Sequence, residues 1–399
     1  SILGRYEDGS PMSDPPLLQS LAYNPLLKKV ELIAEAWDAG GLYQVGSFPS
    51  WSRWGEWNGR YRADLRCFLK GDAGMAPWAA KRITGSRDLY PPEKRGKHAS
   101  VNFITCHDGF TLRDLYSYNE KHNLANGWNN TDGENFNNSW NCGVEGETDD
   151  AEIKALRTKM ALNACVVLLS SVGIPMLLSG DEFGNTQNGN NNPYCQDNEV
   201  SWLDWSLLDE NQDFFHFWQK MIRFRKHHPI LRGSGQKPAL EIPEVSYHSA
   251  RAWDFDEEKQ EGHYVGVMFA GRDESGLEDE VIYLAVNAGW EGVHVDLPLM
   301  PHKEDWRLVV NTSQDFPYNF HEDMDDAPIV ERDLYVPERS VFLLVSKPLP
   351  SWEEAEAMKE KDRLEWAKRQ AGDLYPYHFH LKDKISSGSY SVWKRDLEE

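Results

Sequence analysis

Ionisable side chains follow three apolar stretches of the sequence, each at the place where a buried strand would end. They are Glu35 after residues 32–34, His107 and Asp108 after residues 100–106, and Asp181 and Glu182 after residues 174–179. The carboxyl ends of parallel strands meet at one edge of a sheet, so these groups are expected to gather at one site. Burial disfavours the charged form of a carboxyl group, so Glu35 suits a proton donor. An ion pair with an arginine at a sheet edge would explain Glu35 equally well.

The types of residue at these three strand ends limit the reactions that the site could catalyse. A nucleophilic triad would need Ser or Cys beside the histidine, but Cys106 and His107 are adjacent in the chain, and alternate faces of a strand separate them. No HxH or HExxH pattern surrounds these residues, so a metal site ranks low and no cofactor is expected. Carboxylates without a metal, among many Trp and Asn side chains, indicate glycoside hydrolysis, which uses a pair of carboxyl groups.

The composition limits the class of ligand. The 399-residue chain has a formal charge of −22 and should repel a phosphate backbone, so no nucleic-acid partner is expected. Its 16 Trp residues could form a large aromatic core, or could offer flat platforms for sugar rings. Five Cys residues without a CxxC pattern fit a reducing compartment, such as bacterial cytosol or plastid stroma. No apolar run is long enough to span a membrane, so no membrane partner is expected.

The elements that must position the acidic groups alternate over residues 1–240. Besides the apolar strands, the periodicity predicts helices at residues 61–70, 75–84, 110–122, 149–171 and 213–228. Alternating strands and helices imply a parallel sheet with its active site at the carboxyl ends of the strands. Residues 40–60 are expected to be a long aromatic loop.

The hydrophobic pattern changes after about residue 240. Short apolar runs separated by turn signals predict an antiparallel β-sandwich over residues 241–347, with strands at residues 265–269, 281–286, 293–297, 306–310 and 341–345. Residues 348–399 are predicted to form a charged, partly helical tail. The sequence therefore predicts an α/β region, an all-β domain and a tail.

Several motifs carry a family resemblance. Ala-Glu-Ala-Trp-Asp at residues 34–38 matches the general-acid motif of the α-amylase superfamily of glycoside hydrolases. Phe-Ile-Thr-Cys-His-Asp-Gly at residues 103–109 matches the motif with that family's transition-state-stabilising Asp. Residues 56–61, 137–143 and 189–198 resemble segments typical of its isoamylase branch. Over roughly residues 1–346, the sequence thus resembles isoamylase-type debranching enzymes of glycogen and starch.

The resemblance implies roles for particular residues. Glu35 would be the general acid/base at an α-1,6 branch linkage, and Asp108 would bind the 2- and 3-hydroxyls of the distorted sugar, held also by His107. The further candidate substrate-binding residues are Trp37, Tyr43, Trp57, Asn58 and Tyr194. The partner would be a branched α-glucan.

One part of the family pattern is missing from the sequence. The resemblance implies a retaining mechanism with an Asp nucleophile, and residues 1–5 resemble the segment that comes directly after that Asp. The fold expected for residues 1–240 is thus the second half of a (β/α)8 barrel. Its unpaired edges would call for an N-terminal half or for homo-oligomerisation. A non-catalytic α-glucan-binding or scaffold subunit, or another enzyme of the superfamily, remains an alternative.

Overall fold

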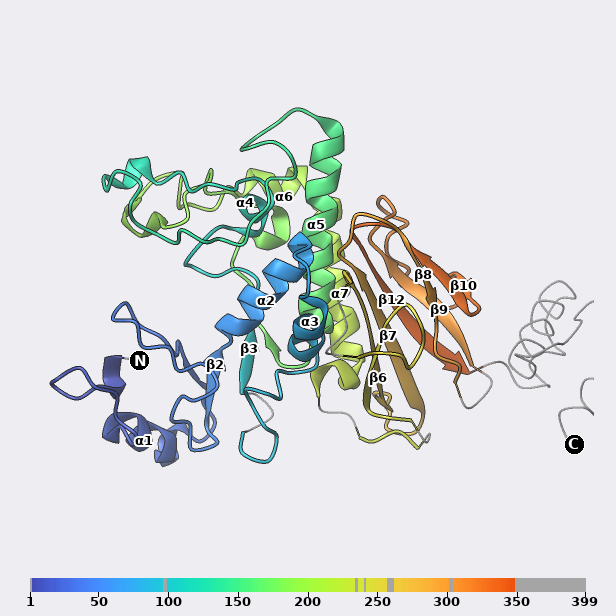
Figure 1. Cartoon of the computed structure of the whole chain (residues 1–399), viewed down its shortest axis with the longest axis horizontal. Helices are drawn as coiled ribbons and strands as arrows, with labels where there is room; N and C mark the ends of the chain where they lie inside the picture. The colour runs from blue at the N-terminus through green and yellow to red at the C-terminus, as the bar shows by residue number, and fades with distance from the viewer. Residues whose placement is uncertain are drawn as a thin grey trace, which may run out of the picture.

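The structure of the chain is a computed structural model that describes residues 2–95, 99–233, 236–239, 242–256, 262–300 and 304–348. Apart from its first residue, the predicted tail at residues 348–399 lies outside the described residues. The described chain contains a four-stranded parallel sheet with helices, followed by a six-stranded and a two-stranded antiparallel sheet. Helices α5 and α7 lie between the two regions (Figure 1).

The parallel sheet contains the three strands that the sequence predicts and one that it does not. Its strands are β1 (Leu32–Ala34), β2 (Trp54–Trp57), β3 (Ser100–Asn102) and β4 (Ile174–Pro175), and their order in the sheet is β1-β2-β3-β4. All neighbours pair in parallel. The observed strands are shorter than the apolar runs that indicated them.

Strand β2 corrects the prediction of a loop over residues 40–60. In its sequence, Trp-Gly-Glu-Trp, a glycine and a glutamate interrupt the apolar pattern, and yet Glu56 is fully buried in the strand. The Glu56 carboxylate pairs with the guanidinium of Arg95 and accepts a 2.7 Å hydrogen bond from the Gly46 backbone N–H. These long-range partners make burial of a charge tolerable, and a local sequence pattern does not contain them.

Four of the five predicted helices lie close to their expected bounds, the helix predicted at residues 110–122 is shorter, and the helix at residues 206–210 was not predicted. They are α1 (Pro16–Tyr23), α2 (Gly59–Lys70), α3 (Ala76–Ile83), α4 (Leu112–Leu115), α5 (Ala151–Ser170), α6 (Ser206–Glu210) and α7 (Gln212–His227). The Asp150 side chain caps α5 by accepting from the Glu152 and Ile153 N–H groups. Helix α4 is much shorter than the predicted 110–122, because the Leu115 and Ser117 carbonyls accept from the Trp140 and Gly146 N–H groups of a later loop. Within the described residues, no helix lies between β1 and β2.

The antiparallel part comprises two sheets. Its strands are β5 (Val245–His248), β6 (Tyr264–Arg272), β7 (Asp279–Asn287), β8 (Val293–Asp296), β9 (Glu304–Asn311), β10 (Ile329–Val330), β11 (Asp333–Val336) and β12 (Ser340–Pro348). The larger sheet has the order β10-β9-β12-β7-β6-β5, and β11 pairs with β8 in the smaller one. The five expected strands are present, whereas β5, β10 and β11 were not predicted.

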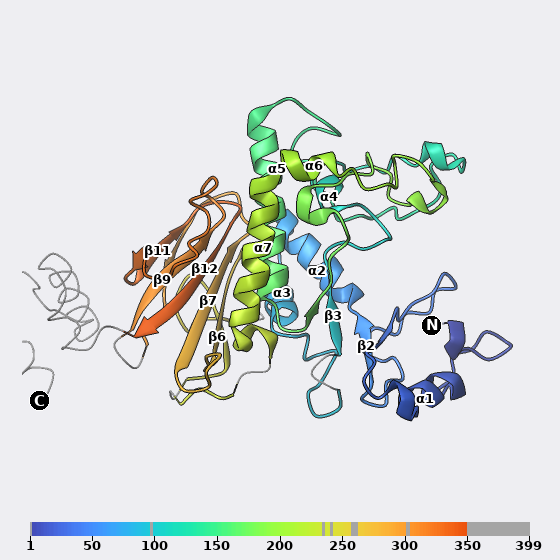
Figure 2. The same ribbon diagram turned by 180° about the vertical axis from the view of Figure 1, so that it is seen from behind.

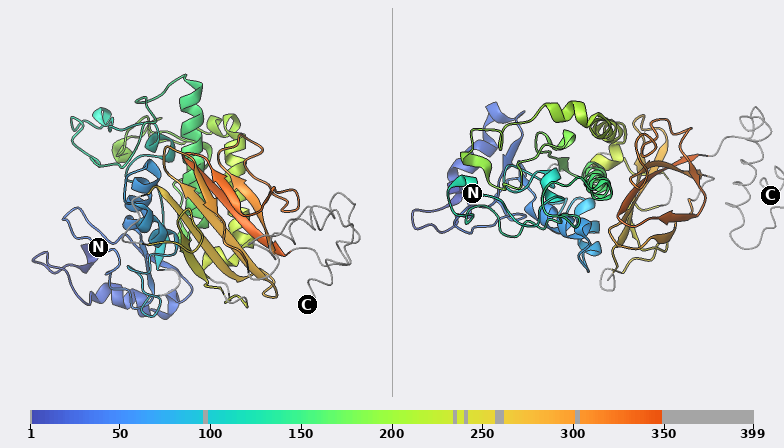
Figure 3. Two further views of the ribbon diagram at one scale, coloured as in Figure 1. Left: turned by 45° about the vertical axis from the view of Figure 1, so that its right-hand side comes forward. Right: turned by 90° about the horizontal axis from the view of Figure 1, so that it is seen from above.

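Both faces of the larger sheet are covered (Figures 2 and 3). On β12, Val341, Leu343 and Val345 pack into the core shared with the helices. Phe342 and Leu344, which alternate with them, pack toward the smaller sheet. The period of two therefore gives three layers, and one core runs from α2, α3, α5 and α7 into the β-sheet.

A buried arginine also connects the helices to the larger antiparallel sheet. Arg339, just before β12, donates hydrogen bonds of 3.1 and 2.7 Å to the Leu69 and Lys70 carbonyls at the end of α2. Its guanidinium also lies 3.6 Å from the centre of the Trp290 ring. A cation is favoured at the carboxyl end of a helix and against an indole face.

Candidate active site

Three of the predicted residues meet at the carboxyl ends of β1 and β3. A carboxylate oxygen of Glu35, a carboxylate oxygen of Asp108 and a ring nitrogen of His107 all lie within 4.8 Å of one another. His107 Nε2 is 3.7 Å from Asp108 Oδ1. On β3 and beyond, residues 101–106 are all buried, and the chain emerges at His107 and Asp108. The end of the buried run therefore presents both side chains.

The surroundings of Glu35 differ from the prediction. It follows the buried Ala34 directly, yet it is exposed, as are His107 and Asp108. The expectation of a buried carboxyl group is therefore wrong for this chain, in which β1 is an edge strand of the described sheet. The three groups could also ligate a cation, although exposed acidic groups commonly lie together without one.

An aromatic pair borders the acidic cluster. Trp37 and Tyr43 form a bridge across a tight turn, and their rings stack at a centroid distance of 6.1 Å and an interplanar angle of 19°. A Cβ atom at Gly59, the first residue of α2, would lie 2.7 Å from the Tyr43 hydroxyl and 3.3 Å from the Trp37 ring. Only glycine lets the helix start so close to the pair. Partial burial raises the pKa of Tyr43, which keeps its hydroxyl a donor.

Of the other predicted binding residues, Trp57 lies beside the acidic cluster, whereas Asn58 and Tyr194 do not line the cleft. Trp57 lies 5.5 Å from the His107 ring and 6.4 Å from the Trp37 ring, measured between centroids. Asn58 is fully buried: it accepts from the Tyr61 N–H to cap α2 and donates to the hydroxyls of Ser86 and Ser100. It therefore holds the fold and does not face the cleft. Tyr194 is 71% exposed and does not line the cleft.

The cleft itself has a volume of about 800 Å³. One wall carries Glu35, Trp37 and Tyr43, and the opposite wall comes from two Asn-rich segments, residues 133–138 and 191–192. In Figure 1 these segments lie in an arm beside the strand ends. Asn191 ties them together, because its amide nitrogen donates 2.8 Å bonds to the Glu134 carbonyl and the Asn137 side chain.

Two residues of the cleft were missed by the sequence reasoning. Phe136 is 84% exposed and lines the cleft, so its ring is available as a platform. Arg66, on α2, donates 2.7 and 3.0 Å bonds to the Ile104 and Asn137 carbonyls, and burial lowers its pKa to about 10. An arginine on the polar face of a helix gives no local signal that it will be buried.

The third acidic pair does not join the cluster. The buried Asp181 carboxylate accepts from the Thr105 hydroxyl and, at 2.8 Å, from the Leu112 N–H. Burial raises its pKa to about 7. Asp181 therefore links the end of β4 to the chain after β3, and Glu182 does not line the cleft.

Comparisons with solved structures identify proteins of similar fold. The backbone matches pullulanase from Bacillus acidopullulyticus with a TM-score of 0.55 at 18% identity, over 79% of this chain and 34% of that one. Pullulanase complexed with maltotetraose from Anoxybacillus sp. LM18-11 matches with a TM-score of 0.53 at 18% identity, over 79% and 39%. The fold is thus similar to part of the pullulanase fold, over about four-fifths of this chain.

Sequence relatives are more specific. The chain is 45% identical over 318 residues to "Isoamylase 3, chloroplastic" of Oryza sativa subsp. japonica, covering 79% of this chain and 39% of the relative. It is 54% identical over 210 residues to a "Glycogen operon protein GlgX homolog" of Mycobacterium tuberculosis, covering 52% and 29%. No family model matches the chain. The resemblance seen in the motifs is confirmed: the chain is a homologue of isoamylases and of GlgX proteins, and it spans about 29–39% of the length of these relatives.

Proposed function

We propose that the protein hydrolyses α-1,6 branch linkages in α-glucans of the starch and glycogen type. The observation that carries this proposal is the meeting of Glu35, His107 and Asp108 within 4.8 Å on a cleft with aromatic walls. The names of the relatives, isoamylase and glycogen operon protein, supply the class of substrate. Stacked aromatic rings beside carboxylates suit a neutral sugar chain, which a protein of charge −22 would not repel.

Each residue takes a defined part in the reaction. Glu35 gives a proton to the bridging oxygen of the branch linkage and later takes one from water. Asp108 binds the 2- and 3-hydroxyls of the reacting sugar and stabilises its developing positive charge, and His107 holds the same ring. Trp37 and Tyr43 offer their stacked faces to the glucan, with Trp57 behind them.

The mechanism we propose is retaining, with an Asp nucleophile outside residues 1–399. The resemblance of residues 1–5 to the segment that follows the family's nucleophilic Asp supports this mechanism. The four parallel strands follow one another in chain order, as they do in a barrel, so we infer that they form half of a (β/α)8 barrel. Edge strands β1 and β4 would then pair with another part of the protein or with a second copy.

The setting of the protein is inferred from the same relatives. We propose a plastid or bacterial cytoplasmic location, supported by the chloroplastic name of the rice relative and by five cysteines that are all free in the described chain. Within the described residues, none of the helices combines the length and apolar character needed to cross a bilayer.

Substitution of the acid tests the proposal directly. Full-length protein should release reducing ends from amylopectin, and Glu35→Gln should abolish this release while glucan binding persists, because an amide cannot give a proton. Glu31→Gln is the matched control, since Glu31 is also exposed but lies at the other end of β1. Turnover that survives in Glu35→Gln would overturn the assignment of the acid.

The exposure of Glu35 and Asp108 favours a second candidate, an α-glucan-binding subunit without catalysis. General acids work best when water is excluded around them. Under this alternative, the full-length protein would bind amylopectin and release no reducing ends, either before or after the Glu35→Gln substitution.

A further inference from the structure

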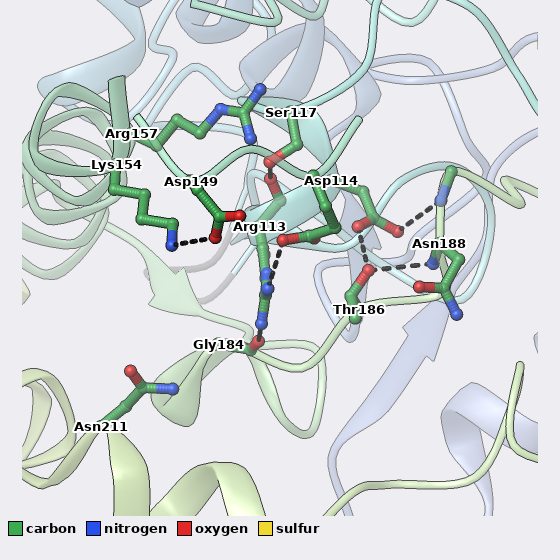
Figure 4. Close-up of polar contacts among 12 residues, drawn as sticks. Arg113, Asp114, Ser117, Asp149, Lys154, Arg157, Gly184, Thr186, Asn188 and Asn211 are labelled. Carbon is green, nitrogen blue, oxygen red and sulfur yellow. Dashed lines mark hydrogen bonds and ion pairs between the residues drawn. The ribbon is translucent and has the colours of Figure 1, made fainter. Parts of the chain in front are cut away.

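A buried carboxylate outside the cleft organises one of its walls. Asp114, on α4, is completely inaccessible to solvent. It accepts hydrogen bonds from the Thr186 hydroxyl and from the backbone N–H groups of Gln187, at 2.8 Å, and Gly189, at 3.3 Å (Figure 4). One side chain thus holds a segment that has neither helix nor strand between residues 184 and 192.

The same segment, residues 184–192, forms hydrogen bonds with Gly109, the residue after the candidate catalytic Asp108. The Gly109 N–H donates a 3.0 Å bond to the Asn191 carbonyl. From the other side, the Gln187 side chain donates to the Asn190 carbonyl at 3.1 Å and reaches the Gly109 carbonyl at 3.5 Å. Both backbone polar groups of the residue after Asp108 therefore face the segment that Asp114 holds.

We propose that Asp114 is a positioning residue, which acts through the segment Thr186–Asn191 to fix the backbone at Gly109 and thereby the direction of the Asp108 carboxylate. The inference rests on the proposed function, because it assigns a part in the same reaction. Asp114 touches neither the cleft nor the acidic cluster. It acts on Asp108 solely through the intervening hydrogen bonds.

The chemistry of the site explains why a carboxylate stands there. Three donors converge on two oxygen atoms, and each donor would be left unsatisfied in the interior if the carboxylate were removed. An Asn side chain could still accept from both N–H groups with its oxygen. The Thr186 hydroxyl could rotate to accept from the new amide nitrogen. Asn should therefore preserve the geometry, whereas Ala should release the segment.

The test uses full-length protein and four variants: Asp114→Ala, Asp114→Asn, Thr186→Val and, as control, Asp149→Asn. Asp149 also lies in the region of Figure 4, but it is fully exposed and pairs with Lys154. We would measure kcat and KM on amylopectin, together with backbone hydrogen exchange over residues 105–112 and 184–192.

The expected result separates positioning from general stability. Asp114→Ala should lower kcat about 10- to 100-fold with little change in KM, because a displaced catalytic group costs turnover more than binding. Exchange should accelerate in both segments. Asp114→Asn should restore most of both properties, Thr186→Val should fall between them, and Asp149→Asn should match the parent protein.

Three outcomes would overturn the proposal: parental kcat in Asp114→Ala, a loss of kcat without faster exchange over residues 184–192, or no recovery in Asp114→Asn. If Asp114→Ala does not fold, parental kcat and exchange in Thr186→Val would overturn it instead. The exchange measurement is independent of turnover. If the parent protein releases no reducing ends, the proposed function fails, while faster exchange confined to both segments in Asp114→Ala would still support the link from Asp114 to Gly109.

Discussion

The parallel sheet and the larger antiparallel sheet of this protein differ in strand length and in exposure. The parallel sheet has strands of two to four residues, and its strand ends carry exposed ionisable groups. The larger antiparallel sheet has strands of up to nine residues, and β6 and β7 are almost entirely buried along their length. Under the proposed function, the reacting groups therefore lie where few backbone pairs constrain the chain, whereas most of the buried strand residues lie where many pairs do. Substitutions in the two regions should accordingly affect different measured quantities.

The largest effect is expected at the strand ends. Asp108→Asn should reduce debranching by full-length protein about 10²- to 10³-fold, because it removes a charge that stabilises the transition state. The melting temperature should hardly change, since the side chain is 55% exposed. Asp333→Asn, at a similarly exposed site on β11, is the control and should alter neither quantity. A large loss of stability in Asp108→Asn would contradict the division between the two regions.

The next largest effect is expected in the core of the larger sheet. Leu343→Ala, at a fully buried position of β12, should lower the free energy of unfolding by about 2–5 kcal/mol. Ile33→Ala on β1 should cost much less, because Ile33 is 43% exposed. Urea denaturation of both variants measures the difference. Equal losses would show that the short parallel sheet is packed as tightly as the long one.

A smaller effect should appear as a dependence of stability on pH. Burial raises the folded-state pKa of Asp181 to about 7, above its ordinary value of 3.8. Between these two values the folded state binds more protons than the unfolded state, so stability should fall as the pH rises from about 4 to about 7. The charged neighbours of Asp181 are Glu182 and Arg66, and only the first adds to the shift.

Asp181→Asn should flatten this part of the profile, because an amide does not titrate. Melting temperatures of the parent protein and the variant, recorded from pH 4 to pH 8, make the comparison. A variant that loses stability as steeply as the parent over that range would show that another group is responsible.

The smallest effect concerns the aromatic wall. Gly59→Ala would place a methyl group 2.7 Å from the Tyr43 hydroxyl and should displace the stacked rings of Trp37 and Tyr43. This displacement should raise KM for amylopectin several-fold. Alanine at the start of α2 should not weaken the helix itself. Gly4→Ala is the control, because a Cβ at Gly4 meets nothing within 4 Å. Unchanged KM in Gly59→Ala would argue that Trp37 and Tyr43 do not contact the glucan.

The sequence predicts those features that depend on neighbours in the chain. Periodicity located α5 and α7, and the motifs brought Glu35, His107 and Asp108 together. Features that depend on partners distant in the chain were not predicted from the sequence. Strand β2 requires Arg95 to bury Glu56, and α4 ends early because N–H groups of a later loop bind its carbonyls. The same reason explains why Asn58 was taken for a binding residue. Its motif is informative about the family, but its buried amide bonds are visible solely in three dimensions.

The core that α5 shares with β12 bears on how such proteins could be recombined. Consider a chimera of two homologues joined near residue 240, where the periodicity changes. It would combine the helices of one parent with a sheet whose side chains pack against the helices of the other parent. Val341, Leu343 and Val345 would meet a foreign helix surface, and Arg339 would need the carbonyls at the end of α2 to lie where they do here. A chimera should therefore fold when α2, α3, α5, α7 and the larger sheet all come from the same parent. The segment to exchange is then defined by the helix–sheet interface and not by the change of periodicity in the sequence.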